Sequence, residues 1–209
     1  MRISKEHEER RNEILNTAEM LFFTKGYAKT TVNDILQAIG IAKGTFYYYF
    51  KSKEEVMDAV VMRFIDAGVA AAKRIAENQE LTVHEKLLQM IMAQKPNSDI
   101  KGQMIEEFHQ ADNAQLHQKS LVETILQLTP VLTEVVEQGI EEKLFKVQYP
   151  RETVEFLLIS SQFLLDEGMF KWQPEEIIRK IKAFIHIMET TLGAETGSLS
   201  YVAQMFEQP

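Results

Sequence analysis

Apolar residues in the first quarter of the chain recur every three or four positions, which is the spacing of helices that bury one face. They predict a first helix over about residues 8–25, ended by Gly26. Its buried face would hold Ile14, Leu15, Ala18, Leu21 and Phe22. A second, shorter helix is predicted to follow Thr31, whose hydroxyl can cap it, and to stop at Gly40. Asp34 stands three residues after the cap, where the acid of a capping box belongs.

The next segment, IAKGTFYYYF over residues 41–50, divides its aromatic residues between two faces. Phe46, Tyr49 and Phe50 are spaced three and four apart and would pack inward. The opposite face would then present Lys43, Thr45, Tyr47 and Tyr48. Because hydroxyls, phenols and ammonium groups bond phosphate oxygens, this face suits nucleic acid.

Two short helices joined at a glycine and braced by a longer helix make a helix-turn-helix, which reads the major groove of DNA. Gly40 can adopt the left-handed backbone conformation that such a turn needs. A small core would hold the two helices at their crossing angle through Ile35, Ile39, Ile41 and Phe46. A further long helix is predicted from Ser52 to about Asn78, capped by the serine with Glu55 at its third position.

The rest of the chain also predicts helices, so the expected fold is all-α. Glycine (9) and proline (5) are scarce among 209 residues, which leaves little material for turn-rich β structure. Further helices are expected over roughly 82–95, 100–111, 114–143, 150–171 and 174–192. Pro130 should bend its helix, whereas Pro150 and Pro174 suit the first turn of theirs. The tail after Gly193 ends in YVAQMF, which could dock or fray.

Charge is divided unevenly along the chain. Residues 1–53 hold nine Lys or Arg against six Asp or Glu, whereas residues 54–209 hold fourteen against twenty-five. We therefore place a domain boundary between residues 53 and 54 and expect only the first domain to meet a polyanion. Cysteine is absent, which excludes disulfides and thiolate chemistry. The sequence has no leader pattern and no apolar run of membrane-spanning length, so we expect a cytoplasmic protein.

Residues 10–60, and above all TTVNDILQAIGIAKGTFYYYFKSKEEVMDAV, resemble the DNA-binding domain of the tetracycline-repressor (TetR) family of bacterial transcription regulators. One position departs from the family pattern, because Leu36 stands where alanine is usual. The resemblance implies that eight residues contact DNA, namely Thr31, Asn33, Lys43, Gly44, Thr45, Tyr47, Tyr48 and Lys53.

The same resemblance implies that residues 54–209 form a helical effector-binding and dimerisation domain. A homodimer would form through the helices at 150–171 and 174–192, and its operator would be a palindrome with half-sites ~34–36 Å apart. Broad apolar faces on these helices fit that role, or else close the core of a single chain: Val154, Leu157, Leu158, Ser161, Leu165, Ile177, Ile181, Phe184, Ile185 and Met188.

We expect a repressor that an unknown small molecule releases from DNA. The candidate ligand-binding residues are Met104, Phe108, His109, Gln162, Phe163 and Asp166, although ordinary core packing explains the apolar ones equally well. The alternative is a DNA-bound regulator or architectural protein whose C-terminal domain holds a protein partner.

Metal, cofactor and enzyme functions are not expected. Glu106 with His109, and His186 with Glu189, have the spacing of helical metal ligands, but the further glutamates of a di-iron site cannot be assembled. We interpret both as solvated surface pairs. The sequence holds no phosphate-binding glycine loop, nucleophile elbow or HExxH motif.

Overall fold

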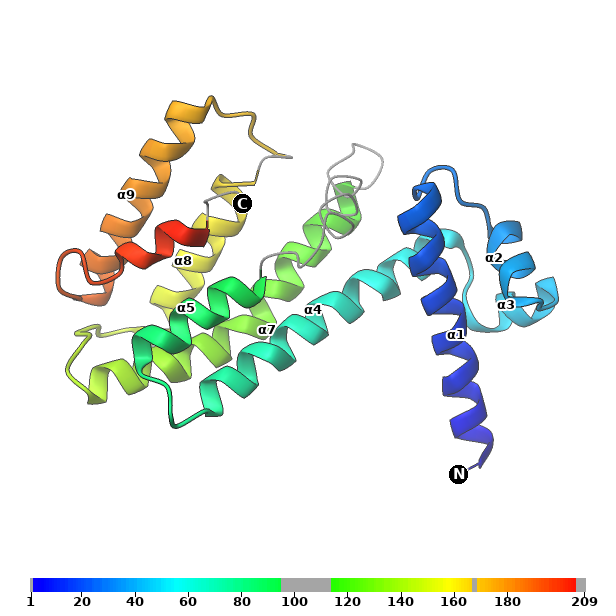
Figure 1. Ribbon diagram of the computed structural model, residues 1–209, viewed down its shortest axis with the longest axis horizontal. Helices are drawn as coiled ribbons and strands as arrows, with labels where there is room; N and C mark the ends of the chain where they lie inside the picture. Colours follow the sequence, from blue (N-terminus) through cyan, green and yellow to red (C-terminus); the bar gives the residue numbers. More distant parts are fainter. Residues whose placement is uncertain (1, 95–113, 167–168, 206–209) are drawn as a thin grey trace. The chain divides into compact units, whose positions relative to one another are not determined.

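The computed structural model describes residues 2–94, 114–166 and 169–205 (Figure 1). Every regular element in these residues is helical, which confirms the all-α prediction. The elements are α1 (Arg2–Lys25), α2 (Val32–Ile39), α3 (Lys43–Tyr49), α4 (Lys53–Glu77), α5 (Val83–Gln94), α7 (Ala114–Glu141), α8 (Pro150–Leu164), α9 (Pro174–Leu192) and the 3₁₀ helix η2 (Ser200–Met205). None of the helices in the described ranges is long and apolar enough to cross a membrane.

The described residues fall into two compact units. The first contains residues 2–64 and 114–117, and the second contains residues 65–94, 118–166 and 169–205. Helix α4 therefore contributes its first turns to one unit and its last turns to the other. The boundary expected after residue 53 stays a prediction.

The first unit is built from α1, α2, α3 and the start of α4, with α2 and α3 beside α1 (Figure 1). Its core confirms the predicted inward faces and contains Ile14, Leu15, Ala18, Phe22, Ile35, Phe46, Phe50, Val56, Met57 and Val60. Ile39, Ile41 and Leu36 are partly buried against this core. Helix α1 begins at Arg2, earlier than the predicted start near residue 8, because the charged opening stretch lacks helix breakers although it carries few apolar residues.

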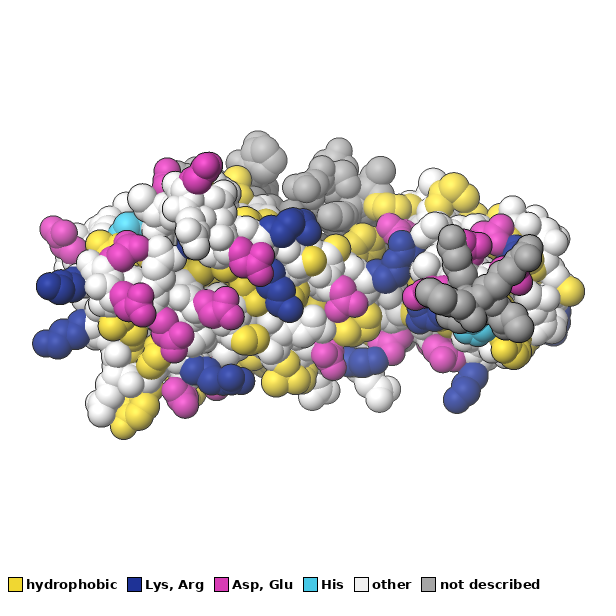
Figure 2. All heavy atoms as spheres, turned by 90° about the horizontal axis from the view of Figure 1, so that it is seen from below, with side chains coloured by type: hydrophobic (Ala, Val, Ile, Leu, Met, Phe, Trp, Pro, Cys, Tyr) yellow, Lys and Arg dark blue, Asp and Glu magenta, His cyan; other side chains and the backbone are white. Residues whose placement is uncertain are grey.

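The second unit has a separate core to which α4, α5, α7, α8, α9 and the tail all contribute. Its buried members are Val69, Ala72, Val83, Met90, Leu128, Val131, Val135, Val136, Phe145, Val154, Leu192, Leu199 and Val202. On the face of this unit seen in Figure 2, acidic side chains are scattered among Lys, Arg and hydrophobic ones. Helix α9 has the predicted bounds, whereas α8 ends at Leu164, seven residues before its predicted end.

Many of the α8 and α9 residues that could form a dimer face or close the core pack into or against this core. Val154 and Ile181 are buried, and Leu157, Leu158, Phe184, Ile185 and Met188 are partly buried against the cluster. These side chains therefore close the second unit. A different set of apolar residues on the same helices remains exposed and is described with the site below.

The tail after α9 docks onto the second unit through a buried carboxylate. One oxygen of Glu189, a residue only 5% exposed, accepts hydrogen bonds from the backbone N–H groups of Gly197 (2.9 Å) and Leu199 (3.0 Å). Glu189 is therefore not the solvated partner of His186 that we expected. Glu106 and His109 lie outside the described residues, and no cluster of three metal-ligating side chains occurs within the described ranges.

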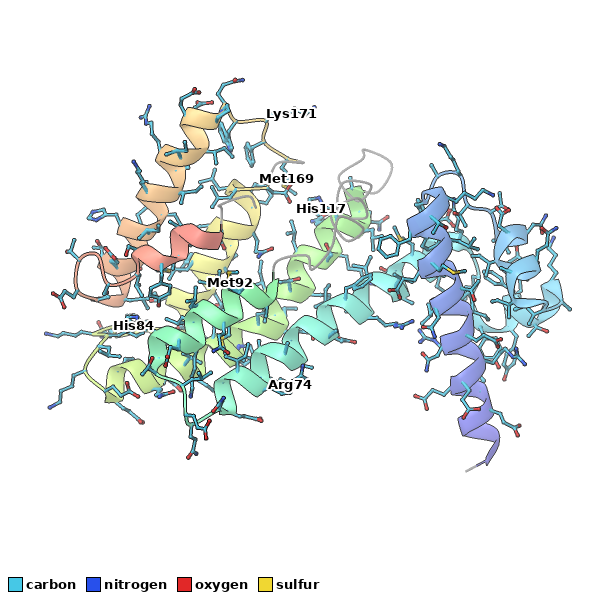
Figure 3. The ribbon with its side chains drawn as sticks, viewed as in Figure 1. Arg74, His84, Met92, His117, Met169 and Lys171 are labelled. Atoms are coloured by element: carbon cyan, nitrogen blue, oxygen red, sulfur yellow. The ribbon has the colours of Figure 1, made fainter. Side chains whose placement is uncertain are left out.

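Polar contacts of two α5 side chains, Lys86 and His84, hold elements of the second unit together. The buried ammonium of Lys86 donates to the backbone oxygen of Ala76 (2.7 Å) and to Oε1 of Gln138 (2.8 Å), which joins α5 to α4 and α7. His84 of α5, labelled in Figure 3, has its Nδ1 3.1 Å from the hydroxyl of Tyr201 in η2.

Candidate nucleic-acid interface

Helix α2 begins with the predicted capping box. The Asp34 N–H donates to the Thr31 hydroxyl (3.2 Å), and the Asp34 carboxylate accepts from the Thr31 N–H (2.7 Å) and hydroxyl (2.7 Å). The ammonium of Lys25 lies 2.6 Å from the same carboxylate. These contacts, Lys25 first and then Thr31, hold the pKa of the Asp34 carboxyl well below its usual range. The capping box therefore uses both donors of the exposed Thr31, its N–H and its hydroxyl. Asn33 is exposed two residues after the cap.

The turn between α2 and α3 favours glycine at position 40, because the backbone there is in the left-handed conformation. Gly40 has φ +78° and donates its N–H to the Leu36 carbonyl oxygen over 2.9 Å. The left-handed region is costly for residues with a side chain. Gly44, in the first turn of α3, has ordinary helical geometry, and a Cβ built there would meet no protein atom within 4 Å. The fold itself therefore does not require a glycine at position 44.

Helix α3 presents two phenols to solvent. Tyr47 is 46% exposed and Tyr48 is 72% exposed, while Phe46 is fully buried beneath them. Lys43 is exposed, with its Nζ 5.8 Å from the centre of the Tyr47 ring. Thr45 is half-buried, so its hydroxyl lies at the edge of this surface. We call the surface formed by Lys43, Gly44, Thr45, Tyr47 and Tyr48 the α3 face.

Lys53 connects the start of α4 to the loop before α2. Its Nζ donates to the Tyr27 backbone oxygen (2.8 Å) and lies 4.1 Å from the centre of the Tyr27 ring. Burial, followed by the neighbouring Glu54 carboxylate, raises the pKa of the Tyr27 phenol to about 12. An ammonium has three N–H donors, so Lys53 retains donors for a further acceptor. The family resemblance implied a phosphate contact for Lys53, whereas nothing in the sequence indicated this contact with Tyr27.

A groove of about 700 Å³ lies between the first turns of α1 and the α3 face. It is lined by Glu6, His7, Glu9, Arg10, Glu13, Thr45, Tyr48 and Tyr49. The His7 ring contacts Tyr49 at 4.6 Å and Tyr48 at 5.6 Å between ring centres. Sequence reasoning missed this contact because the predicted first helix began after His7, where the apolar spacing becomes visible.

Three of the candidate ligand residues, Met104, Phe108 and His109, lie outside the described residues. The other three are at the end of α8. Gln162 and Asp166 are half-buried and Phe163 is 49% exposed. The Phe163 ring meets the Phe170 ring edge-on at 5.7 Å, and Asp166 accepts a hydrogen bond from the Met169 N–H. A ligand-binding role for these residues stays a prediction.

An apolar stripe remains exposed on α8. Phe156 is 72%, Ile159 45% and Phe163 49% exposed. Their spacing of three and then four residues places them on one side of the helix. On α9, Ile178 and Ile187 are also exposed, at 53% and 52%. Large aromatic and aliphatic side chains exposed in a row mark a surface that gains stability when it is covered.

Two family models match the chain and together cover about two thirds of it. Residues 14–60 match the model described as bacterial regulatory proteins, tetR family. Residues 96–187 match the tetracyclin repressor-like C-terminal domain.

Similar proteins agree with these matches. The HTH-type transcriptional repressor KstR2 of Mycolicibacterium smegmatis is 36% identical over 84 residues, which are 40% of this chain and 40% of that protein. The chain thus spans about two fifths of the length of the first curated relatives it matches. A TetR-family regulator from Pectobacterium atrosepticum has the same fold, with a TM-score of 0.63 at 17% identity over 90% of this chain and 96% of that one. RolR, solved in complex with resorcinol, has a TM-score of 0.62 at 15% identity over 99% and 97% of the two chains.

Proposed function

This chain belongs to the TetR family of bacterial regulatory proteins, and we propose that it is a homodimeric, DNA-binding transcriptional repressor that a small molecule releases from its operator. The observation that carries the DNA-binding part is the α3 face, where two exposed phenols and a lysine stand on a helix fixed by buried Phe46. Such a protein acts where the chromosome is, in the cytoplasm, and no catalytic role is assigned to it.

In this proposal the α3 face enters the major groove. Lys43, Thr45, Tyr47 and Tyr48 contact phosphates or base edges, and Gly44 lets the backbone approach the duplex closely. Asn33 contacts the DNA backbone from the start of α2, and Lys53 contacts a phosphate from the start of α4. Thr31 does so by turning its hydroxyl hydrogen from the Asp34 carboxylate to a phosphate. Tyrosine suits this task because its ring is stiff, so little conformational entropy is lost when its hydroxyl is fixed.

The homodimer assembles through α8 and α9. The exposed stripe of Phe156, Ile159 and Phe163 supports this, because a second copy would remove three large apolar side chains from water. Twofold symmetry would present two α3 faces about one duplex turn (~34–36 Å) apart, so the operator is a palindrome.

The effector is a small molecule held in the second unit. RolR, which has the same fold, carries resorcinol as its ligand, and this supports a small aromatic or apolar compound as the class to test here. Release requires the ligand to favour a dimer whose α3 faces no longer match adjacent major grooves. A shift from mostly bound to mostly free needs about 5 kcal/mol of differential affinity.

The test is fluorescence anisotropy with labelled DNA from upstream of the gene, at two salt concentrations, with scrambled competitor DNA. Tight, competitor-resistant binding supports a sequence-specific regulator, and the same assay then screens small phenols and other apolar compounds for release. The variant Tyr47→Phe removes one hydroxyl from the α3 face and should weaken binding about threefold to tenfold. Tyr149→Phe is the matched control, because Tyr149 is 61% exposed in the second unit.

Weak binding that salt abolishes, with no preference over scrambled DNA, contradicts a role at that operator. Specific binding that no small molecule relieves contradicts the effector part alone and favours a protein partner for the second unit. Unchanged binding by Tyr47→Phe removes Tyr47 from the contacts.

A further inference from the structure

His7 lies at the edge of the proposed DNA-binding surface although it belongs to the first turns of α1. Its ring is 5.6 Å from the ring of Tyr48, in an edge-to-face arrangement, and 4.6 Å from that of Tyr49. Tyr48 is the most exposed aromatic residue of α3, at 72%. The exposed His7 side chain therefore adjoins the phenol that reaches furthest into solvent from the α3 face.

The groove beside His7 is lined by charged side chains from α1 and by polar and aromatic side chains from α3. From α1, the groove is lined by the carboxylates of Glu6, Glu9 and Glu13 and by the guanidinium of Arg10, which pairs with Glu13. From α3 it is lined by Thr45, Tyr48 and Tyr49, which bring hydroxyls and aromatic rings but no cation. Because the three carboxylates repel a phosphate, an imidazolium at position 7 favours a phosphate here more than a neutral imidazole does.

We infer that His7 is a further DNA-contacting residue whose contribution depends on its protonation. The imidazolium would add a positive charge beside Tyr48, where a phosphate bonded by the phenol lies within its reach. This inference rests on the proposed DNA-binding function, and it adds α1 to the elements that meet the duplex.

Operator affinity should rise at lower pH if the protonated imidazole of His7 is the form that binds DNA. Imidazole gains its charge as the pH falls from about 8 to about 5. A phosphate beside it stabilises the protonated form, so DNA binding takes up a proton and affinity rises as the pH falls through that range. Each protonated His7 also displaces about one counterion from the DNA, which steepens the dependence of affinity on salt.

A purely structural role for His7 would give a different result. Stacking against Tyr48 and Tyr49 needs only a flat ring, whereas the proposed role needs the charge. The other histidine in the described part of the first unit, His117 on α7, is buried and is not among the residues that line the groove. The two roles are therefore separated by variants that change the charge at position 7.

The experiment measures operator affinity by anisotropy at about pH 6 and about pH 8, each at two salt concentrations. The chain is tested in full length as wild type, His7→Gln, His7→Lys and the control His186→Gln, which removes an exposed histidine of the second unit. Wild type and the control should bind about twofold to fivefold more tightly per protomer at the lower pH, as expected for an exposed charge contact. His7→Gln should lose that gain, and His7→Lys should bind tightly at both pH values.

Three results overturn the inference. The first is a wild-type affinity that does not change with pH, and the second is a pH gain that persists in His7→Gln. The third is a loss of operator affinity in His7→Gln that is equal at both pH values, leaves the salt slope unchanged and is not restored in His7→Lys. That result would mean that His7 acts only by packing against the tyrosine rings. Circular dichroism of each variant shows whether the helices remain intact. If the proposed function itself is wrong, the wild-type protein will bind the operator no more tightly than scrambled DNA at either pH.

Discussion

The ammonium of Lys53 donates a hydrogen bond to the backbone oxygen of Tyr27 over 2.8 Å and lies 4.1 Å from the centre of that residue's ring. This contact joins the first turn of α4 to the loop that carries Thr31, the cap of α2. Lys53 therefore has two tasks in the proposed function. It fixes the position of the loop, and its remaining donors can bond a phosphate.

Replacing Lys53 with methionine keeps most of the aliphatic stem and removes the charge. We expect the slope of log affinity against log salt to become shallower by about one unit per protomer, because one phosphate contact is lost. We also expect about 1 kcal/mol less stability from the lost bond to Tyr27. Salt titration of operator binding measures the first effect, and thermal unfolding measures the second. A stability loss with an unchanged salt slope leaves Lys53 as a brace and removes its phosphate contact.

A side chain at position 44 should affect folding and DNA binding in opposite directions. Glycine inside a helix is less stable than alanine by about 0.5–1 kcal/mol, and a Cβ at position 44 would meet no protein atom within 4 Å. We therefore expect Gly44→Ala to raise the free energy of unfolding by up to that amount while it weakens operator binding, since the added methyl meets the duplex. Denaturant unfolding and anisotropy measure the two effects on the same sample.

The control for this prediction is Gly40→Ala. At Gly40 the backbone φ of +78° opposes a side chain, so alanine there should destabilise the protein. If Gly44→Ala binds DNA as wild type does, the duplex does not approach this position closely.

The capping of α2 makes part of the stability depend on pH. Lys25 and Thr31 hold the pKa of the Asp34 carboxyl below its usual range, so the carboxylate is favoured more in the folded than in the unfolded chain. The resulting stability is present above the ordinary aspartate value, about pH 4, and is lost as the pH falls below it. We expect Asp34→Asn to be less stable than wild type near neutral pH, and the difference in melting temperature to shrink on acidification. A difference that stays constant with pH contradicts a role for the charge.

The helix-turn-helix could be predicted from sequence because the signals that set it are local. Thr31, Asp34 and Gly40 specify the two ends of α2 through contacts that span a few residues, and the spacing of Phe46 and Phe50 specifies the buried side of α3. Each of these was confirmed in the structure.

What the sequence did not reveal depends on residues far apart in the chain. Glu189 is charged and lies on a predicted helix, so the sequence suggests an exposed residue. It is buried because the segment after α9 packs on it and donates the Gly197 and Leu199 N–H groups to its carboxylate. His7 precedes the visible apolar pattern of α1 and gains its meaning only from Tyr48, some forty residues later. The sequence left open whether the apolar residues of α8 close the core or face a second copy, because apolar residues occur on both sides of this helix.

The exposed apolar stripe of Phe156, Ile159 and Phe163 on α8 predicts the surface through which two copies pair. Phe156 is 72% exposed and lies on the same side of the helix as Phe163. If a second copy covers this side, a carboxylate at position 156 would be buried at the interface without a partner, which is strongly unfavourable. We expect Phe156→Glu to be monomeric by analytical ultracentrifugation, to keep its helices, and to lose most of its affinity for a palindromic operator while retaining that of a single half-site.

Arg151→Glu is the matched control for that variant. It introduces the same side chain on the same helix, but at an exposed position five residues from Phe156 and therefore on the opposite side. The control should remain dimeric and bind the palindrome as wild type does, because the pair of Arg151 with Glu155 that it breaks is exposed and contributes little. Loss of the dimer in both variants means that the interface extends beyond the Phe156 side of α8, and retention in both removes the Phe156 side from the interface. An interface that includes the Phe156 side lets α8 hold the two α3 faces at the spacing of a palindromic operator.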